Sequence, residues 1–200
     1  MGWSAPLRFE AWLRRTAIVN GALSDAQREF EEIASYIGYQ RISRIVDIGC
    51  GHALINLFFW RRYRCTIHLV DIESTSAHHH DLHETGAGYA SLDAAKLFLT
   101  ANGVPPSSVR LTNPQRRPLK DSDCDIVMSL LSCGFHYPAA TYGDFVKSAL
   151  RPGGAFIFDM RKRSGQEAFL DGFCRHDVIR DAAKYQRVAA VKRVAAVNGN

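Results

Sequence analysis

The residues best suited to chemistry lie at positions 46–53, where the sequence reads VDIGCGHA. An apolar run ends there in a Gly-x-Gly turn and a helical pattern follows, the context in which such a turn binds a ligand. Gly49 and Gly51 lack Cβ atoms, so the chain can turn tightly and a ligand can approach its backbone. A second apolar run, about twenty residues further on as in dinucleotide folds, ends in Asp71. A carboxylate there can accept hydrogen bonds from both hydroxyls of a ribose.

A glycine turn by itself is weak evidence, because many α/β proteins use one only to pack a helix on a sheet. The acid after the second apolar run makes the ligand-binding interpretation much stronger. NAD fits poorly, since its fingerprint needs a third Gly or Ala where this chain has Leu54. A phosphate loop is excluded, because the sequence contains no GxxxxGK[ST] motif.

The elements that must position these residues alternate between strand and helix. This pattern predicts an α/β fold: a doubly wound, mostly parallel seven-stranded sheet with helices on both faces. Ligands of such sheets bind beyond the carboxyl ends of the strands. Strands are predicted at 43–48, 65–72, 108–112, 124–131, 155–160, 176–180 and 185–194. Helices are predicted at 5–16, 24–37, 53–62, 91–102, 140–150 and 166–173. Residues 1–38 are expected to be a helical segment packing on a domain that spans 39–197.

Composition limits the class of protein. The chain has 200 residues, 46% of them hydrophobic, which suits one domain with a substantial core. Its five cysteines include no CxxC pair, and neither a signal peptide nor an apolar stretch long enough for a membrane span is visible, so we expect a reduced, cytoplasmic protein. The net charge is +5, but Lys and Arg are dispersed, which favours a solvated surface over a nucleic-acid-binding patch. An anionic substrate or RNA stays open.

Four motifs in order resemble those of class I methyltransferases that use S-adenosylmethionine (SAM). VDIGCGHA resembles the first motif of that family, and LVDIE at 69–73 resembles the end of its second strand. CDIVMSLL at 124–131 is similar to its fourth strand, and LRPGGAFIF at 150–158 to the turn into its fifth. The resemblance covers residues 40–160 and implies a Rossmann-like fold that binds SAM.

The resemblance also implies roles for individual residues. Asp47 would face the methionine end of SAM, with Gly49, Cys50 and Gly51 beneath it. Asp71, followed by Ile72, would hold the ribose hydroxyls. Asn113 would lie near the adenine amino group, from which its amide oxygen can accept a hydrogen bond. Leu130 would line the adenine or the methionine pocket. Ala53 stands where the family has its last glycine, a difference that bears on affinity more than on fold.

The segment after the fourth strand, SLLSCGFHYP at 129–138, bears on the acceptor. The D/N-P-P-Y/F/W box of base and glutamine N-methyltransferases is absent, and so is the acid with which catechol-type members bind magnesium. We therefore expect a metal-independent enzyme. In-line methyl transfer depends mainly on alignment, and a base is needed only where the acceptor loses a proton. His136 and Tyr137 are the candidates, with Cys133 nearby, and packing of the two rings under the next helix is the alternative.

The predicted function is methyl transfer from SAM to an oxygen or nitrogen of a small molecule. Two alternatives stay open: an RNA-modifying methyltransferase, suggested by the basic balance, and a non-catalytic SAM-binding protein. The histidine-rich stretch at 78–83, within 73–90, is expected to be a solvated cover over the cofactor. It is not expected to be a metal site, because consecutive histidines point in different directions.

Overall fold

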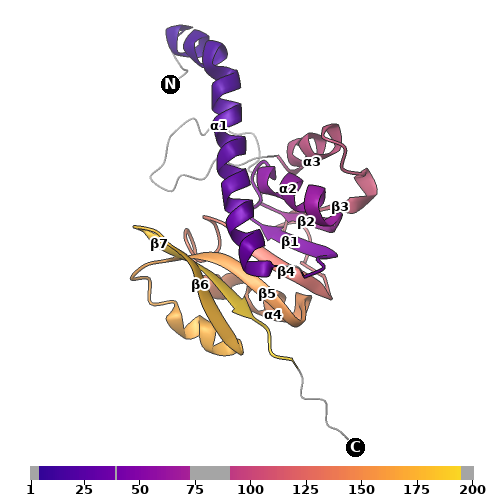
Figure 1. Cartoon of the computed structure of the whole chain (residues 1–200), viewed down its shortest axis with the longest axis vertical. Coiled ribbons are helices and arrows are strands. Elements are labelled where there is room, and N and C mark those ends of the chain that lie inside the picture. Colours follow the sequence, from indigo (N-terminus) through magenta and orange to yellow (C-terminus); the bar gives the residue numbers. More distant parts are fainter. Residues whose placement is uncertain (1–4, 39, 73–90, 195–200) are drawn as a thin grey trace, which may run out of the picture.

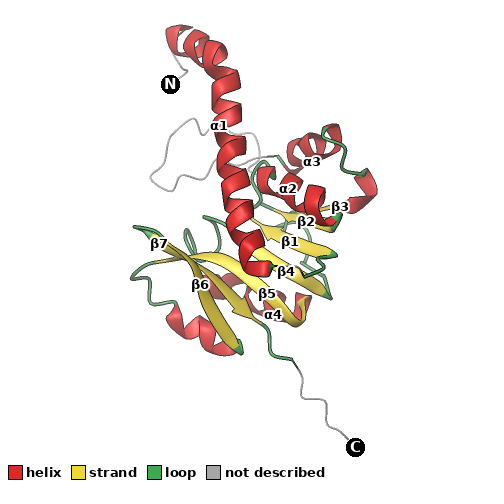
Figure 2. Cartoon of the chain, in the orientation of Figure 1, coloured by secondary structure: helices red, strands yellow, loops and turns green. Residues whose placement is uncertain are grey.

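The chain folds around one seven-stranded sheet (Figure 1 and Figure 2). The structure is a computed structural model that describes residues 5–38, 40–72 and 91–194. Its strands are β1 (Arg44–Ile48), β2 (Thr66–Val70), β3 (Val109–Thr112), β4 (Cys124–Ser129), β5 (Leu150–Arg161), β6 (Arg175–Asp181) and β7 (Tyr185–Val191). Its α-helices are α1 (Ala5–Ile37), α2 (Leu54–Tyr63), α3 (Leu92–Ala101) and α4 (Gly143–Ala149). Three short 3-10 helices are η1 (Pro106–Ser108), η2 (Ala139–Tyr142) and η3 (Glu167–Gly172).

The strand order is β3-β2-β1-β4-β5-β7-β6. Strands β1 to β5 are parallel, whereas β7 runs antiparallel to both β5 and β6. The chain winds outward from β1 in one direction and from β4 in the other, so strand order reverses between these two strands. This topology confirms the predicted doubly wound, mostly parallel sheet, and it makes the carboxyl ends of β1 and β4 the expected ligand site.

Helices cover both faces of the sheet, because side chains alternate along each strand. In β1, Ile45 packs with α1, α2 and α3 on one face, and Val46 packs with α4 and η3 on the other. The central strands are buried on both sides, as their nearly continuous apolar sequences require. The two cores leave the loops at the strand ends as the places where polar side chains can gather.

The N-terminal region differs from the prediction. A single helix, α1, replaces the expected pair at 5–16 and 24–37. The intervening residues contain Gly21 but no proline, and one glycine costs a helix only about 1 kcal/mol relative to alanine. The C-terminal half of α1 packs through Phe30, Ile33 and Ile37 into the core that it shares with α2 and one face of the sheet, whereas its N-terminal part extends past the other elements (Figure 1). The division at residue 38 stays a prediction.

Three further elements depart from their predicted form. The predicted helix at 140–150 is shorter, since η2 precedes α4 and β5 begins at its last residue. Strand β5 then runs through Pro152-Gly153-Gly154, which was expected to be a turn, with an irregularity in its pairing to β4. The predicted helix at 166–173 is a 3-10 helix, η3. In the first two cases pairing with β4 sets the boundary, because Leu150 and Ala155 are already partners of Cys124 and Ile126.

A buried ion network fastens α1 to the sheet. Arg187 of β7 is fully buried, and its Nε donates to Asp159 of β5 over 2.8 Å. Its Nη2 and Nη1 reach Glu29 and Glu32 of α1 over 2.9 and 3.3 Å. The backbone N–H of Leu131, just after β4, donates to the same Asp159 over 3.0 Å. The network therefore ties α1 to the carboxyl end of β4.

Candidate functional site

The glycine turn between β1 and α2 is tightly packed on one side and open on the other. Gly49 has a φ of +75°, and a Cβ built there would lie 2.0 Å from the hydroxyl oxygen of Ser132. Gly51 has a φ of +53°, but nothing lies within 4 Å of the position of its Cβ. Gly49 is thus required by the loop after β4, whereas Gly51 opens a space beside its backbone into which a ligand can fit.

Asp71 faces this turn from the end of β2. Its Oδ2 accepts a hydrogen bond from the backbone N–H of Gly51 over 2.9 Å. The side chain is partly exposed, as is Ile72 beside it. The thiol of Cys50 lies 4.0 Å from the same oxygen, and burial raises the pKa of this thiol far above its usual range. The predicted carboxylate and glycine turn are therefore in contact across β1 and β2.

Asp47 lies within β1, almost completely buried at 3% exposure. Its Oδ2 accepts from Nδ2 of Asn56 on α2 over 2.6 Å. The pKa of Asp47 is raised to about 7, mainly by burial; the hydrogen bond from Asn56 opposes this rise, and the nearby carboxylates of Asp71 and Glu29 add to it. A carboxyl group with this pKa gains its charge readily when a cation arrives beside it. Asp47 is therefore suited to a positively charged ligand group.

Asn113 follows β3 and carries an unused donor. Its Oδ1 accepts from the backbone N–H of Gln115 over 2.9 Å. Its Nδ2 is buried and has no hydrogen-bond partner among the described residues. We expected the amide oxygen to accept from an adenine amino group. An amide oxygen has two lone pairs, so the expected bond stays a prediction, and the unpartnered Nδ2 adds a donor that suits an acceptor such as a ring nitrogen.

The loop after β4 places Tyr137 beside the turn. The hydroxyl of Tyr137 lies 2.9 Å from Oγ of Ser132, the residue that packs on Gly49. Its ring centroid lies 6.0 Å from that of Tyr142. Burial raises the pKa of Tyr137 well above its usual range. Tyr137 therefore stays protonated and can donate or accept a hydrogen bond, but it is poorly suited to be a base.

Leu130 and Leu131 begin this loop. Leu130 is partly buried against the core, so it is available to line a pocket. Leu131 is exposed, with a φ of +50°. The hydroxyl of Ser129 anchors their start, since it donates to the carbonyl of Ile48 and accepts from the N–H of Cys133, both over 2.8 Å.

His136 lies on the outer side of the same loop. It is exposed, and its ring meets that of Phe135 edge to face at 5.0 Å. It lines a hollow of about 580 Å³ together with Arg161, Lys162, Arg163 and Lys184. The ring is therefore not buried under the following helix, as a purely structural histidine would be. His136 is accessible at the carboxyl edge of the sheet.

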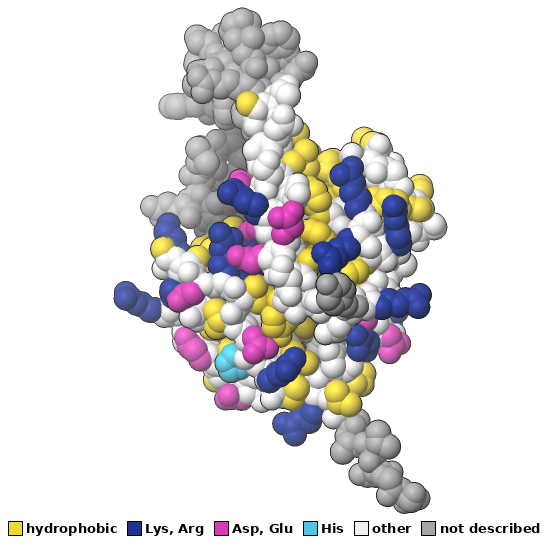
Figure 3. Space-filling view, in the orientation of Figure 1, with side chains coloured by type: hydrophobic (Ala, Val, Ile, Leu, Met, Phe, Trp, Pro, Cys, Tyr) yellow, Lys and Arg dark blue, Asp and Glu magenta, His cyan; other side chains and the backbone are white. Residues whose placement is uncertain are grey.

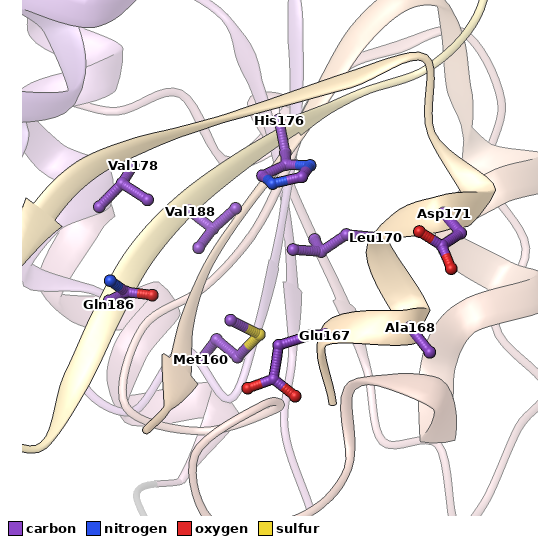
Figure 4. Close-up of a pocket in the computed structure, with 9 residues that line it drawn as sticks. All are labelled: Met160, Glu167, Ala168, Leu170, Asp171, His176, Val178, Gln186 and Val188. Atoms are coloured by element: carbon purple, nitrogen blue, oxygen red, sulfur yellow. The ribbon is translucent and has the colours of Figure 1, made fainter. Parts of the chain in front are cut away.

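A second hollow, of about 470 Å³, lies between η3 and the β6–β7 hairpin. Its floor is apolar, from Met160, Leu170 and Val188, and His176 and Glu167 stand at its sides (Figure 4). None of the predicted site residues lines it. It is therefore separate from the site at the glycine turn.

Sequence reasoning missed several residues of the site. Asn56 was visible as a polar residue in the apolar helix sequence LINLFFW, and Arg187 as a charge within RVAAV. Both contact buried acids, which explains a polar residue at those places. Ser132 and Tyr142 carried no such signal, because only the folded loop brings them to the turn and to Tyr137.

Two expectations concern metals and membranes. The histidine-rich stretch at 78–83 lies outside the described residues. Among the residues that are described, no group of three or more His, Cys, Asp or Glu side chains is arranged to hold a metal ion. In the same part of the chain, none of the helices combines the length and apolar character needed to cross a bilayer.

Solved structures share this fold. A protein from Nostoc punctiforme to which O-methyltransferase activity has been ascribed superposes with a TM-score of 0.58 at 17% identity, over 86% of this chain and 56% of its own. An O-methyltransferase family protein from Burkholderia thailandensis gives 0.58 at 16%, over 98% and 64%. The SAM-dependent methyltransferase SibL gives 0.56 at 15%, over 88% and 58%.

No family model and no curated protein sequence matches the chain. The chain spans less than two thirds of the length of each of these three structures. At such low identities the likeness concerns the arrangement of the backbone. The strand order, the turn after β1 and these superpositions agree: the chain has the fold of the class I, SAM-dependent methyltransferases.

Proposed function

We propose that this protein transfers a methyl group from SAM to an oxygen or nitrogen of a small molecule, without a metal ion. One observation carries the proposal. Polar groups lie at the carboxyl ends of the neighbouring strands β1, β2 and β3, beside the point where strand order reverses, which is where such sheets bind ligands. They are the carboxyl group of Asp47, the amide of Asn113 and the turn at Gly51 that Asp71 faces.

The residues present fit SAM along its length. The cationic amino group of its methionine end suits Asp47, whose buried carboxyl has a pKa near 7. The open space at Gly51 would admit the body of the cofactor beside Cys50, and Asp71 with Ile72 would hold the ribose. The orphan Nδ2 of Asn113 would donate to an adenine ring nitrogen, and Leu130 would pack on the base.

SAM, when bound, supplies a methyl group already activated by its sulfonium. The chain's own task is then to align the acceptor and to receive its proton. His136 is the proposed proton acceptor, because it is exposed at the carboxyl edge and a neutral imidazole nitrogen can accept a proton. Tyr137 is proposed to orient the acceptor through its protonated hydroxyl. Treatment with a chelator should leave this reaction unchanged. Five free cysteines support a cytoplasmic setting.

Titration calorimetry tests the cofactor assignment. SAM and S-adenosylhomocysteine should bind to the wild type and NAD should not. The substitution Asp71→Ala should weaken SAM binding by about 1–3 kcal/mol, because hydrogen bonds to a carboxylate are lost. Asp171→Ala removes the same charge at the second hollow and is the matched control, with affinity expected to stay as in the wild type. Equal affinities for the wild type and Asp71→Ala would remove the proposed role of Asp71.

A further inference from the structure

The hollow beside His136 is strongly basic. Four of the seven residues that line it are cationic: Arg161, Lys162, Arg163 and Lys184. Lys162 is paired, since its Nζ lies 2.5 Å from Asp181. Among the described residues, no carboxylate forms an ion pair with the other three. The hollow thus has an excess of positive charge that nothing in the described structure neutralises.

Backbone hydrogen bonds join the three segments that form this hollow. The N–H of Arg161 donates to the carbonyl of Gly134 in the loop after β4, and the N–H of Lys162 donates to the carbonyl of Lys184, both over 3.0 Å. Gln166 adds a side-chain bond to the same Gly134 carbonyl over 2.9 Å. The cationic side chains therefore project from a framework that is already assembled, which reduces the entropy lost when a ligand binds.

The hollow is also near the proposed cofactor site. Arg161 is the last residue of β5, which lies two strands away from β1 and parallel to it. Phe158 is level with Ile48 across β4, and Arg161 lies three residues further along β5. With strands about 4.8 Å apart and a rise of about 3.3 Å per residue, this end of the hollow is about 14 Å from the end of β1. His136 and Tyr137 come from the loop between them. A molecule bound in the hollow could therefore extend past His136 toward the glycine turn.

We propose that this hollow binds the anionic group of the acceptor, so that the substrate is a small molecule bearing a carboxylate or a phosphate. The inference rests on the proposed methyltransferase function and narrows its substrate class. Arg161 also lies 5.8 Å from the centroid of the Phe135 ring, which gives the hollow an apolar wall beside its charges. A ring that carries the anionic group fits such a wall.

RNA is the less favoured ligand. A hollow of about 580 Å³ is the size of a small-molecule site. On the face shown in Figure 3, which includes α1 and β6, the Lys and Arg side chains are separated by acidic, apolar and uncharged ones and do not form a continuous basic track. An extended polyanion needs such a track, whereas one carboxylate or phosphate does not.

The test uses benzoate and inorganic phosphate as probes, titrated into the whole chain while NMR follows the His136 ring signals. The double variant Arg163→Gln/Lys184→Gln removes two charges from exposed side chains. The matched control, Arg41→Gln/Lys120→Gln, removes two charges that precede β1 and β4, at the opposite edge of the sheet. The first variant should weaken binding of the probe about tenfold, as expected for two exposed charges close to an anion, and the control should bind as the wild type does.

The proposal is supported if either probe binds saturably and this binding is lost in the first variant but not in the control. If only benzoate binds, the anionic group is a carboxylate; if only phosphate binds, it is a phosphate. A nuclear Overhauser effect between bound benzoate and S-adenosylhomocysteine would place the anion within reach of the cofactor. The proposal is overturned if neither probe shifts the His136 signals, if both variants weaken binding equally, or if a single-stranded oligoribonucleotide binds there more tightly than benzoate. Failure of S-adenosylhomocysteine to bind, measured separately, would instead remove the proposed methyltransferase function.

Discussion

Buried acids at the amino edge and at the carboxyl edge of the sheet differ in how fully they are hydrogen-bonded. At the amino edge, Asp125 accepts hydrogen bonds from the N–H groups of Ser43 and Arg44 over 2.7 and 2.9 Å, and from Nε of Arg151 over 2.6 Å. At the carboxyl edge, Asp47 accepts one side-chain hydrogen bond, from Asn56, whose own Oδ1 has no partner among the described residues. One acid is held by three donors, whereas the other lies in a site with hydrogen-bonding capacity left over.

The histidines differ in the same way. His68 of β2 is buried, with Nδ1 2.8 Å from Asp121 and Nε2 2.8 Å from the hydroxyl of Thr112. Burial alone would raise the pKa of Asp121, but the hydrogen bond with His68 and the nearby Arg110 hold it below its ordinary value. His136 is exposed in a basic hollow.

Buried polar groups are costly unless they are satisfied. The amino edge meets that requirement with the chain's own atoms, so its acids stabilise the fold. The carboxyl edge meets it only in part, which is expected where a ligand supplies the missing partners. Variants at the two edges should therefore separate stability from activity.

The largest effect is expected at His136. If it receives the acceptor's proton, His136→Ala should lower the turnover number by about 10²–10⁴-fold. The melting temperature and the affinity for SAM should stay near those of the wild type, because the side chain is exposed. His176→Ala, at the exposed histidine of the second hollow, is the control and should keep full turnover. Normal turnover in His136→Ala would give the role to another group or to none.

The next effect concerns Asp125 and the free energy of unfolding. Asp125→Ala leaves two backbone N–H groups and Arg151 without their acceptor, which should cost about 2–4 kcal/mol. Urea unfolding measures this loss. Calorimetry on the folded fraction should show the affinity of the wild type for S-adenosylhomocysteine. A variant that keeps its stability but loses the ligand would reverse the comparison between the edges.

A smaller, pH-dependent effect is expected at Asp47. Burial raises its pKa from an ordinary 3.8 to about 7, so the folded protein binds this proton more tightly than the unfolded chain does. The stability that the proton contributes is complete below pH 3.8 and is lost as the pH rises through 7. Asp47→Asn removes this loss, and its stability relative to the wild type should increase by about 1–3 kcal/mol between pH 4 and pH 7.5.

Urea unfolding of both proteins across that range provides the measurement. A difference in stability that does not change with pH would mean that Asp47 is ionised throughout. The carboxyl group would then be satisfied like Asp125, and the contrast between the edges would fail at this residue.

The sequence predicted the sheet well because its strands are short apolar runs that end in polar or glycine residues. The sequence also predicted that the glycine turn and Asp71 lie close together, because the carboxyl ends of parallel strands share an edge of the sheet, and the hydrogen bond from Gly51 to Asp71 agrees with this. The continuous helix α1 was missed because residues 17–23 have no core-facing pattern to predict it: those whose burial is described are exposed or half-buried.

The finer chemistry of the site depended on contacts between distant segments. Asn113 was predicted to offer its amide oxygen, and only the folded turn shows that this oxygen already accepts one hydrogen bond from Gln115 while Nδ2 is a buried donor without a partner among the described residues. Tyr137 and His136 are neighbours in sequence, yet one faces Ser132 and the other a basic hollow. Residue types alone cannot give such directions, because the loop conformation sets them.

The most direct test of the central claim is a crystal structure of the chain with S-adenosylhomocysteine. The account predicts the ligand over the turn at Gly49–Gly51, with its ribose hydroxyls on Asp71, its amino group toward Asp47 and its adenine beside Nδ2 of Asn113. Density for the ligand in the hollow between η3 and the β6–β7 hairpin, or at any position that leaves Asp47 and Asn113 without new partners, would contradict it.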